Sequence, residues 1–108
     1  MSHPLDRPAP RAQPRESNLR ATVLREINTR PHGWAFATTG IAEGGIPDVV
    51  GSYRHRALAL ELKTATGRLS PRQRRHLRLA AAAGAEAHVV REVSELRAIL
   101  DRIDKETE

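Results

Sequence analysis

Cysteine is absent from the sequence of 108 residues, which excludes disulfide bonds and metal sites built from thiolates. No apolar run reaches the length of a membrane span or of the hydrophobic part of a signal peptide. We therefore expect a soluble, cytoplasmic protein with no membrane partner. The length fits one domain with a modest core.

Lysine and aromatic residues are scarce. Only Lys63 and Lys105 are lysines among the 18 basic residues, so a lysine inside an apolar segment points to a role. With one Trp, one Tyr and one Phe, neither long helix combines a basic face with aromatic anchors, which argues against a membrane-surface function. We interpret Trp34 and Tyr53 as core and hairpin residues.

Positive charge is concentrated in one part of the chain. The formal net charge is +5 and the sequence pI is about 10.9, which favours anionic partners, nucleic acid before acidic membranes. Eight basic residues and only one acidic residue, Glu61, lie between Arg54 and Arg78. The segment from Glu92 to Glu108 instead holds six acidic and three basic residues.

Composition and periodicity divide the chain into three regions. Residues 1–15 carry four prolines and no apolar periodicity, which predicts a disordered basic arm that either tracks DNA or has no role. Residues 16–104 form the predicted domain, and 105–108 form a tail. Apolar spacing predicts helices over 16–30, 71–83 and 94–103, and strands over 34–38, 46–51, 57–63 and 87–91. The order α-β-β-β-α-β-α predicts an α/β fold with a central mixed four-stranded sheet flanked by helices.

Three charged residues, Asp48, Glu61 and Lys63, stand inside the two middle apolar strands. A hairpin turn centred between residues 54 and 55 places residue 48 opposite residue 61, with Cβ atoms about 5 Å apart. Lys63 then shares the face of Glu61, because side chains alternate along a strand. Two such carboxylates repel unless a cation lies between them, and Mg²⁺ accepts one or two carboxylates together with water and phosphate oxygens. The alternative is that Glu61 and Lys63 face solvent on a strand with one wet face.

Three segments carry a family resemblance: Gly45-Ile46-Pro47-Asp48, Glu61-Leu62-Lys63, and "TATGRLSPRQ", which ends in Gln73. Together they resemble the signature of PD-(D/E)XK nucleases, and more narrowly the VRR-NUC branch found in phages, bacteria and repair nucleases. Glu16 matches the acidic residue on the first helix of that branch. The resemblance extends from Glu16 to about Leu100.

The resemblance implies a restriction-endonuclease-like core and a DNA endonuclease that depends on Mg²⁺ or Mn²⁺. Asp48, Glu61 and the backbone carbonyl of Leu62 would then bind the metal, and Lys63 would be the catalytic lysine. Glu16 would support the metal or its water, and Gln73 would approach the site from its helix. Two alternatives stay open: Glu16 as a first-turn acid that favours the helix dipole, and Gln73 as a capping-box partner of Ser70.

A cluster of arginines follows the site, and we expect these side chains to contact DNA phosphates, although a solvated basic face is the alternative. The cluster comprises Arg68, Arg72, Arg74, Arg75 and Arg78. The five histidines show no metal-ligand spacing. For function we expect a homodimer that cleaves branched DNA such as four-way junctions, in a bacterial or phage-infected cell. The alternatives are a monomeric nuclease directed to flaps or nicks, and a basic DNA-binding protein without catalysis.

Overall fold

The structure of the chain, a computed structural model, describes residues 16–39 and 44–108, without the side chains of residues 16 and 17. The predicted basic arm over 1–15 lies outside the described residues. Three helices and four strands follow in the predicted order: α1 (Glu16–Thr29), β1 (Gly33–Ala37), β2 (Val49–Tyr53), β3 (Arg56–Leu62), α2 (Pro71–Ala82), β4 (Glu86–Val90) and α3 (Val93–Thr107). Within the described residues every helix is too short or too polar to span a bilayer.

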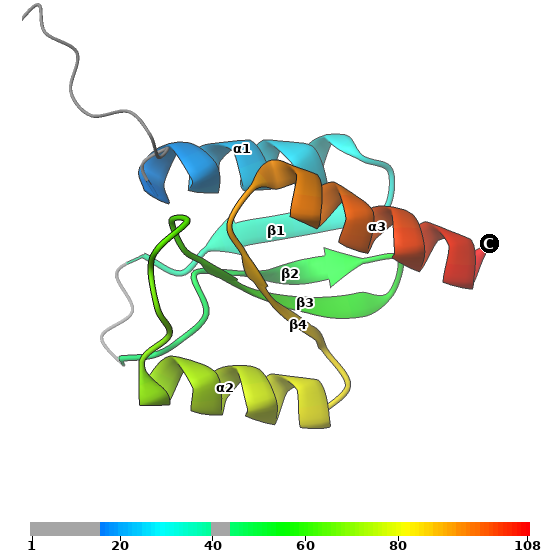
Figure 1. The fold of residues 1–108 in the computed structure, drawn as a ribbon. Coiled ribbons are helices and arrows are strands. Elements are labelled where there is room, and N and C mark those ends of the chain that lie inside the picture. Colours follow the sequence, from blue (N-terminus) through cyan, green and yellow to red (C-terminus); the bar gives the residue numbers. More distant parts are fainter. Residues whose placement is uncertain (1–15, 40–43) are drawn as a thin grey trace, which may run out of the picture.

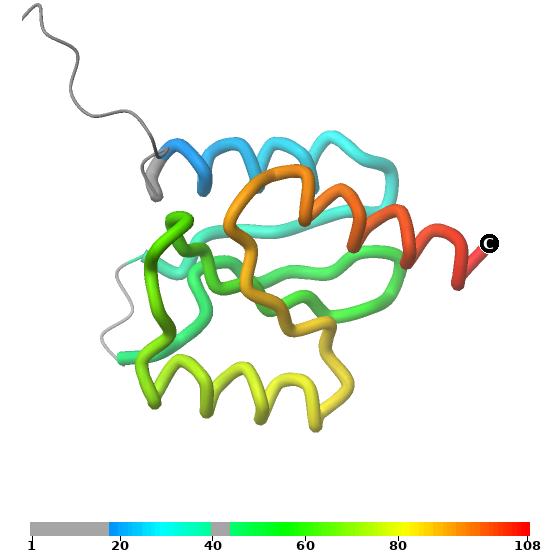
Figure 2. The backbone as a smooth tube through the Cα atoms, in the orientation of Figure 1, coloured from blue at the N-terminus to red at the C-terminus, as the bar shows by residue number. Residues whose placement is uncertain are grey.

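The four strands form one mixed sheet in the order β1-β2-β3-β4. The first three strands pair antiparallel, and β4 pairs parallel with β3. Helices α1 and α3 lie on one side of the sheet, and α2 lies on the other (Figure 1). Figure 2 follows the chain from β3 across to α2 and back through β4, which is the crossover that a parallel pair requires. The predicted α/β fold with a mixed four-stranded sheet is therefore confirmed.

The hairpin between β2 and β3 has the predicted register. Val49 lies opposite Leu60, and Tyr53 opposite Arg56. The two turn residues between the strands, Arg54 and His55, both have positive φ, at 48° and 71°. Positive φ at both central residues is typical of the type I′ turn that fits the twist of a two-residue hairpin.

The core lies between the sheet and the pair α1 and α3. Leu58, Leu60 and Leu62 point to this side from β3, as their spacing predicts, and all three are buried. They pack with apolar residues of the two helices, namely Leu19, Val23, Ile27, Leu96, Leu100 and Ile103. Tyr53 belongs to the same core, and its hydroxyl donates a hydrogen bond to Asp104 (2.7 Å). The interpretation of Trp34 as a core residue is wrong, because 62% of its surface is exposed.

Arginines near the hairpin turn pair with the acidic residues of α3 and with Glu86 on β4. Glu86 accepts hydrogen bonds from the guanidinium groups of Arg102 (2.6 Å) and Arg56 (3.2 Å). The bond from Arg102 is the main reason that the pKa of Glu86 falls from its ordinary 4.5 to about 2, against the opposing effect of burial. The carboxylate of Glu86 therefore stays charged in the folded protein at pH values where the unfolded chain takes up a proton.

Glu86→Gln should lower the free energy of unfolding near pH 7 by about 1 kcal/mol, the upper end for partly exposed ion pairs. Because the folded pKa is below the ordinary value, this contribution is complete above about pH 4.5 and is lost as the pH falls toward 2. Urea unfolding of wild type and variant should therefore differ less near pH 3 than near pH 7. Glu108→Gln, the same charge change at the exposed chain end, is the control. An equal difference at both pH values would contradict the assigned ion pair.

Candidate active site

Asp48 stands at the point where β2 begins, next to β3. The hairpin register that pairs Val49 with Leu60 continues to place Asp48 across from Glu61. The carboxylate Oδ2 of Asp48 accepts a hydrogen bond from the backbone N–H of Leu62 (2.8 Å). Asp48 is therefore fixed against β3 by its side chain, one residue away from Glu61.

Glu61 is the one charged side chain in the buried class among the described residues, with 2% of its surface exposed. Its Oε2 accepts a hydrogen bond from the Gln73 side-chain amide (2.7 Å), and the Lys63 ammonium lies 3.9 Å from the same oxygen. Lys63 itself has only 16% of its side chain exposed. A buried carboxylate is costly unless it is paired and hydrogen-bonded. The alternative of solvent-facing side chains is therefore wrong for Glu61.

Gln73 connects the start of α2 to the buried carboxylate. Its backbone N–H donates to the Ser70 hydroxyl (3.1 Å), and its side-chain oxygen accepts from the Ser70 N–H (2.8 Å). This is the capping box that the sequence allows. The amide nitrogen of the same side chain is the donor to Glu61. A side-chain amide has an acceptor end and a donor end, so the two alternatives for Gln73 hold together.

The loop that carries Asp48 lies against the first turn of α2. Gly45 has a φ of +87°, and a Cβ there would lie 2.6 Å from the Cβ of Arg72. On the other side, the Thr38 hydroxyl donates to the carbonyl of Pro47 (2.6 Å), and the Thr38 N–H donates to the carbonyl of Asp48 (2.9 Å). The Gly-Ile-Pro-Asp segment is therefore held between the end of β1 and the start of α2.

Gly45→Ala should displace Asp48, because the added Cβ collides with Arg72 and the left-handed backbone costs about 1–2 kcal/mol for a residue with a Cβ. We expect a large shift of the Leu62 amide signal in a nitrogen–proton correlation spectrum, since that N–H is the donor to Asp48. Gly84→Ala is the matched control, because Gly84 also has a positive φ, +102°, but open space around its Cβ position. Gly84→Ala should lose only the stability that the left-handed backbone costs, and Gly45→Ala should lose more because of the collision with Arg72. A Leu62 amide that moves equally in both would contradict the clamping of Asp48 by this loop.

The five arginines of the predicted cluster differ from five other arginines that pair with acidic side chains. Arg30, Arg54, Arg56, Arg97 and Arg102 pair with carboxylates at 2.6–3.2 Å. In the described part of the chain, no acidic side chain forms an ion pair with Arg68, Arg72, Arg74, Arg75 or Arg78, and all five are exposed. Positive charge is therefore left without neutralisation at the start and outer side of α2.

The donor set at the carboxylates fits a hard cation. Within residues 16–39 and 44–108, no three side chains of His, Cys, Asp or Glu come together as a metal site, and the side chain of Glu16 lies outside what the structure describes. Asp48 and Glu61 remain, both of them oxygen ligands. Mg²⁺ binds through one or two carboxylates and completes its shell with water and phosphate oxygens. These oxygen ligands therefore suit Mg²⁺ or Mn²⁺ better than they suit metals that prefer imidazole or thiolate ligands.

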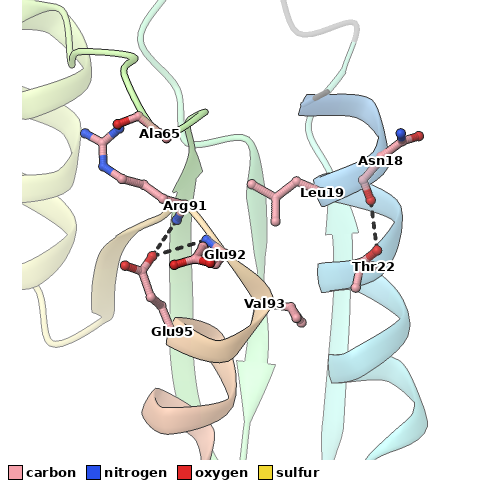
Figure 3. Close-up of a pocket in the computed structure, with 8 residues that line it drawn as sticks. All are labelled: Asn18, Leu19, Thr22, Ala65, Arg91, Glu92, Val93 and Glu95. Carbon is pink, nitrogen blue, oxygen red and sulfur yellow. Dashed lines mark hydrogen bonds between the residues drawn. The ribbon is translucent and has the colours of Figure 1, made fainter. Parts of the chain in front are cut away.

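A pocket of about 490 Å³ lies beside the loop that follows Lys63 (Figure 3). It is lined by Leu19 and Thr22 of α1, by Ala65, by Arg91 and Glu92 between β4 and α3, and by Glu95 of α3. Among the predicted catalytic residues whose side chains the structure describes, none lines it. The Arg91 guanidinium donates to the carbonyl of Thr64 (2.6 Å). Arg91 ties the loop after Lys63 to the end of β4 and was not among the residues predicted from the sequence. The contact depends on the path of that loop, so no local pattern indicates it.

No family model matches the sequence, and no curated protein matches it. Among solved structures, a VRR_NUC domain protein superposes with a TM-score of 0.64 over 81% of this chain and 85% of that protein. The two chains share 16% sequence identity, so the comparison establishes the likeness of fold. The three helices and the mixed four-stranded sheet are consistent with the restriction-endonuclease-like core that the sequence led us to expect.

Proposed function

We propose that this chain is a metal-dependent DNA endonuclease of the PD-(D/E)XK type. The observation that carries the proposal is the buried carboxylate of Glu61, which is held by Gln73 at 2.7 Å and has the Lys63 ammonium at 3.9 Å. A protein that only binds DNA has no need for a buried acid beside a lysine, since phosphate contact requires exposed cations. The likeness of fold to a VRR_NUC domain protein supports the same reading.

Each residue of the candidate site has a role in this proposal. Asp48, Glu61 and the carbonyl of Leu62 would hold Mg²⁺ or Mn²⁺, and Glu16 would support that site from α1. When bound, the cation polarises a phosphoryl oxygen and makes water a stronger nucleophile at neutral pH. Lys63 places a positive charge where negative charge develops on the phosphate. Gln73 fixes the rotamer of Glu61, and the five arginines of α2 and its approach contact the DNA backbone.

Glu61→Gln should reduce cleavage by about a thousandfold, because the several kcal/mol that the cation supplies depend on this ligand. Asp48→Asn should do the same. DNA binding measured in EDTA by fluorescence anisotropy should change little, since the arginine cluster is intact. Cleavage is measured in the presence of Mn²⁺ as the amount of product formed from labelled nicked duplexes, flaps and four-way junctions. Glu108→Gln is the control of equal charge change.

A second measurement separates catalysis from metal binding. Mn²⁺ should raise the melting temperature of the wild-type protein, because a ligand that binds only the folded state stabilises it. The rise should be smaller for Glu61→Gln. Turnover by either carboxylate variant at the wild-type rate would refute the assignment, and DNA binding without any metal-dependent product would favour the non-catalytic alternative.

We further propose that two copies of the chain act together on branched DNA. A two-fold dimer would present two copies of the arginine cluster and two sites to a substrate that is itself two-fold symmetric, such as a four-way junction. The cluster offers phosphate contacts, which position DNA without reading its sequence, so DNA shape would supply the selectivity.

Gel filtration with light scattering should show a mass of two chains, with or without junction DNA. Mapping of the products on a junction should show paired nicks placed symmetrically across the branch point. A single-chain mass at every concentration, with unpaired nicks at scattered positions or at flaps, would support the monomeric alternative instead.

A further inference from the structure

Two aromatic side chains, Trp34 and Phe36, stand exposed on the edge strand β1. They expose 62% and 46% of their surface, and their ring centroids lie 5.2 Å apart with the planes tilted by 58°. Ala35, between them in sequence, is buried toward α1. Because side chains alternate along a strand, this aromatic pair projects from the sheet face opposite α1 and α3.

The aromatic pair shares its sheet face with Glu61. Phe36 pairs with Val50, Val50 with Ala59, and Ala59 with Ala87, which makes one continuous row across the sheet. Glu61 follows Ala59 by two residues and so projects to the same side, one row further along. Strands about 4.8 Å apart and a rise of about 3.4 Å per residue put Phe36 roughly 12 Å from Glu61. A single bound DNA strand can span that distance.

Helix α2 covers only part of this face. It packs against β3 and β4, and Figure 1 shows it on the far side of the sheet from α1 and α3. The face between the aromatic pair and α2 carries Val50 and the small side chains of Ser52, Ala57 and Ala59. The candidate site therefore has exposed aromatic rings on one side and exposed arginines on the other.

We propose that Trp34 and Phe36 stack on unpaired bases of the bound DNA while the arginine cluster holds its phosphates. Aromatic rings beside a basic surface are the arrangement that binds unpaired nucleotides, because every base offers a face for stacking. The substrate class is then DNA with unpaired nucleotides next to the cleaved bond, as in gaps, flaps and open branch points. This inference rests on the proposed nuclease function and specifies its substrate.

A second copy of the chain is a poorer occupant of this face. Two aromatic side chains have about 150–250 Å² each to bury, far below the roughly 800 Å² per partner of a stable interface. The strand edge beside them is also blocked at its centre. The Asn28 side chain accepts from the N–H of Ala35 and donates to its carbonyl, both at 3.0 Å, and so occupies the groups that the middle residue of β1 would offer to a fifth strand.

The experiment uses intrinsic fluorescence, because Trp34 is the only tryptophan of the chain. In EDTA, where no cleavage occurs, a duplex with a short single-stranded gap should quench the emission of Trp34. A fully paired duplex of equal length should bind with much less quenching. Labelled DNA gives the binding curves: Trp34→Ala and Phe36→Ala should each weaken binding to gapped DNA by about tenfold or more, and leave duplex binding nearly unchanged.

Three controls separate stacking from other causes. Trp34→Phe keeps a ring and should retain most of the affinity for gapped DNA. Leu79→Ala removes a comparably exposed apolar side chain from α2, at 51% exposure, and should leave the preference for gapped DNA intact. Heparin, an anion without bases, should bind without quenching. Thermal melts confirm that each variant folds.

Several results would overturn the inference. Emission that stays constant while gapped DNA saturates the protein would show that no base reaches Trp34, even if cleavage is normal. Equal quenching by heparin would show that the quenching comes from the binding of an anion and not from the stacking of a base. Two results together would assign the face to a second copy of the chain. The emission of Trp34 would change with protein concentration in the absence of DNA, and Trp34→Ala would convert a two-chain mass into a single-chain mass. Quenching by gapped DNA in a protein without nuclease activity would instead support the inference and refute the proposed chemistry.

Discussion

The hydrogen bond between Gln73 and Glu61 is the contact on which the arrangement of the candidate site depends. It joins the first turn of α2 to a buried carboxylate near the end of β3. Because a buried charge must be satisfied by nearby dipoles or charges, the start of α2 has to lie where Gln73 reaches Glu61. The Asp48 loop packs on that same first turn at Gly45, so one bond places both carboxylates relative to the helix.

Charge is divided between the two ends of the molecule. At the hairpin turn, the acids of α3 and Glu86 neutralise Arg30, Arg54, Arg56 and Arg102. At α2 the arginines have no such partners among the described residues. The net charge of +5 is therefore a poor guide to the surface by itself. The acidic residues of α3 neutralise arginines near the hairpin turn, so the positive electrostatic potential is concentrated at the arginine cluster beside Glu61 and Lys63.

The sequence was sufficient for the elements, their order and the hairpin register, because a two-residue turn leaves one way to oppose the strands. It also allowed both roles of Gln73, because this residue stands three positions after Ser70, as a capping box requires, and also ends the motif that follows Lys63. It failed for Trp34, which was interpreted as a core residue and is exposed. Helix α1 lies so close to β1 that only small residues fit between them: a Cβ on Gly33 would lie 2.2 Å from the carbonyl oxygen of Ile27. The large rings of this strand therefore take the other face. The contact of Arg91 with Thr64 depends on the path of a loop, which no local pattern encodes.

Helix α2 has no fully buried side chain, in contrast to α1 and α3, which supply six of the thirteen buried core residues. Its first turn is held at Ser70, Gln73 and the contact of Arg72 with Gly45, and the helix also contacts β3 and β4. Segments with few buried apolar contacts open at lower free energy than the whole fold. Detachment of α2 alone would expose Glu61 to water, release the Asp48 loop and carry the arginines away together. Local unfolding of this one helix would therefore disassemble the site and leave the core under α1 and α3 in place.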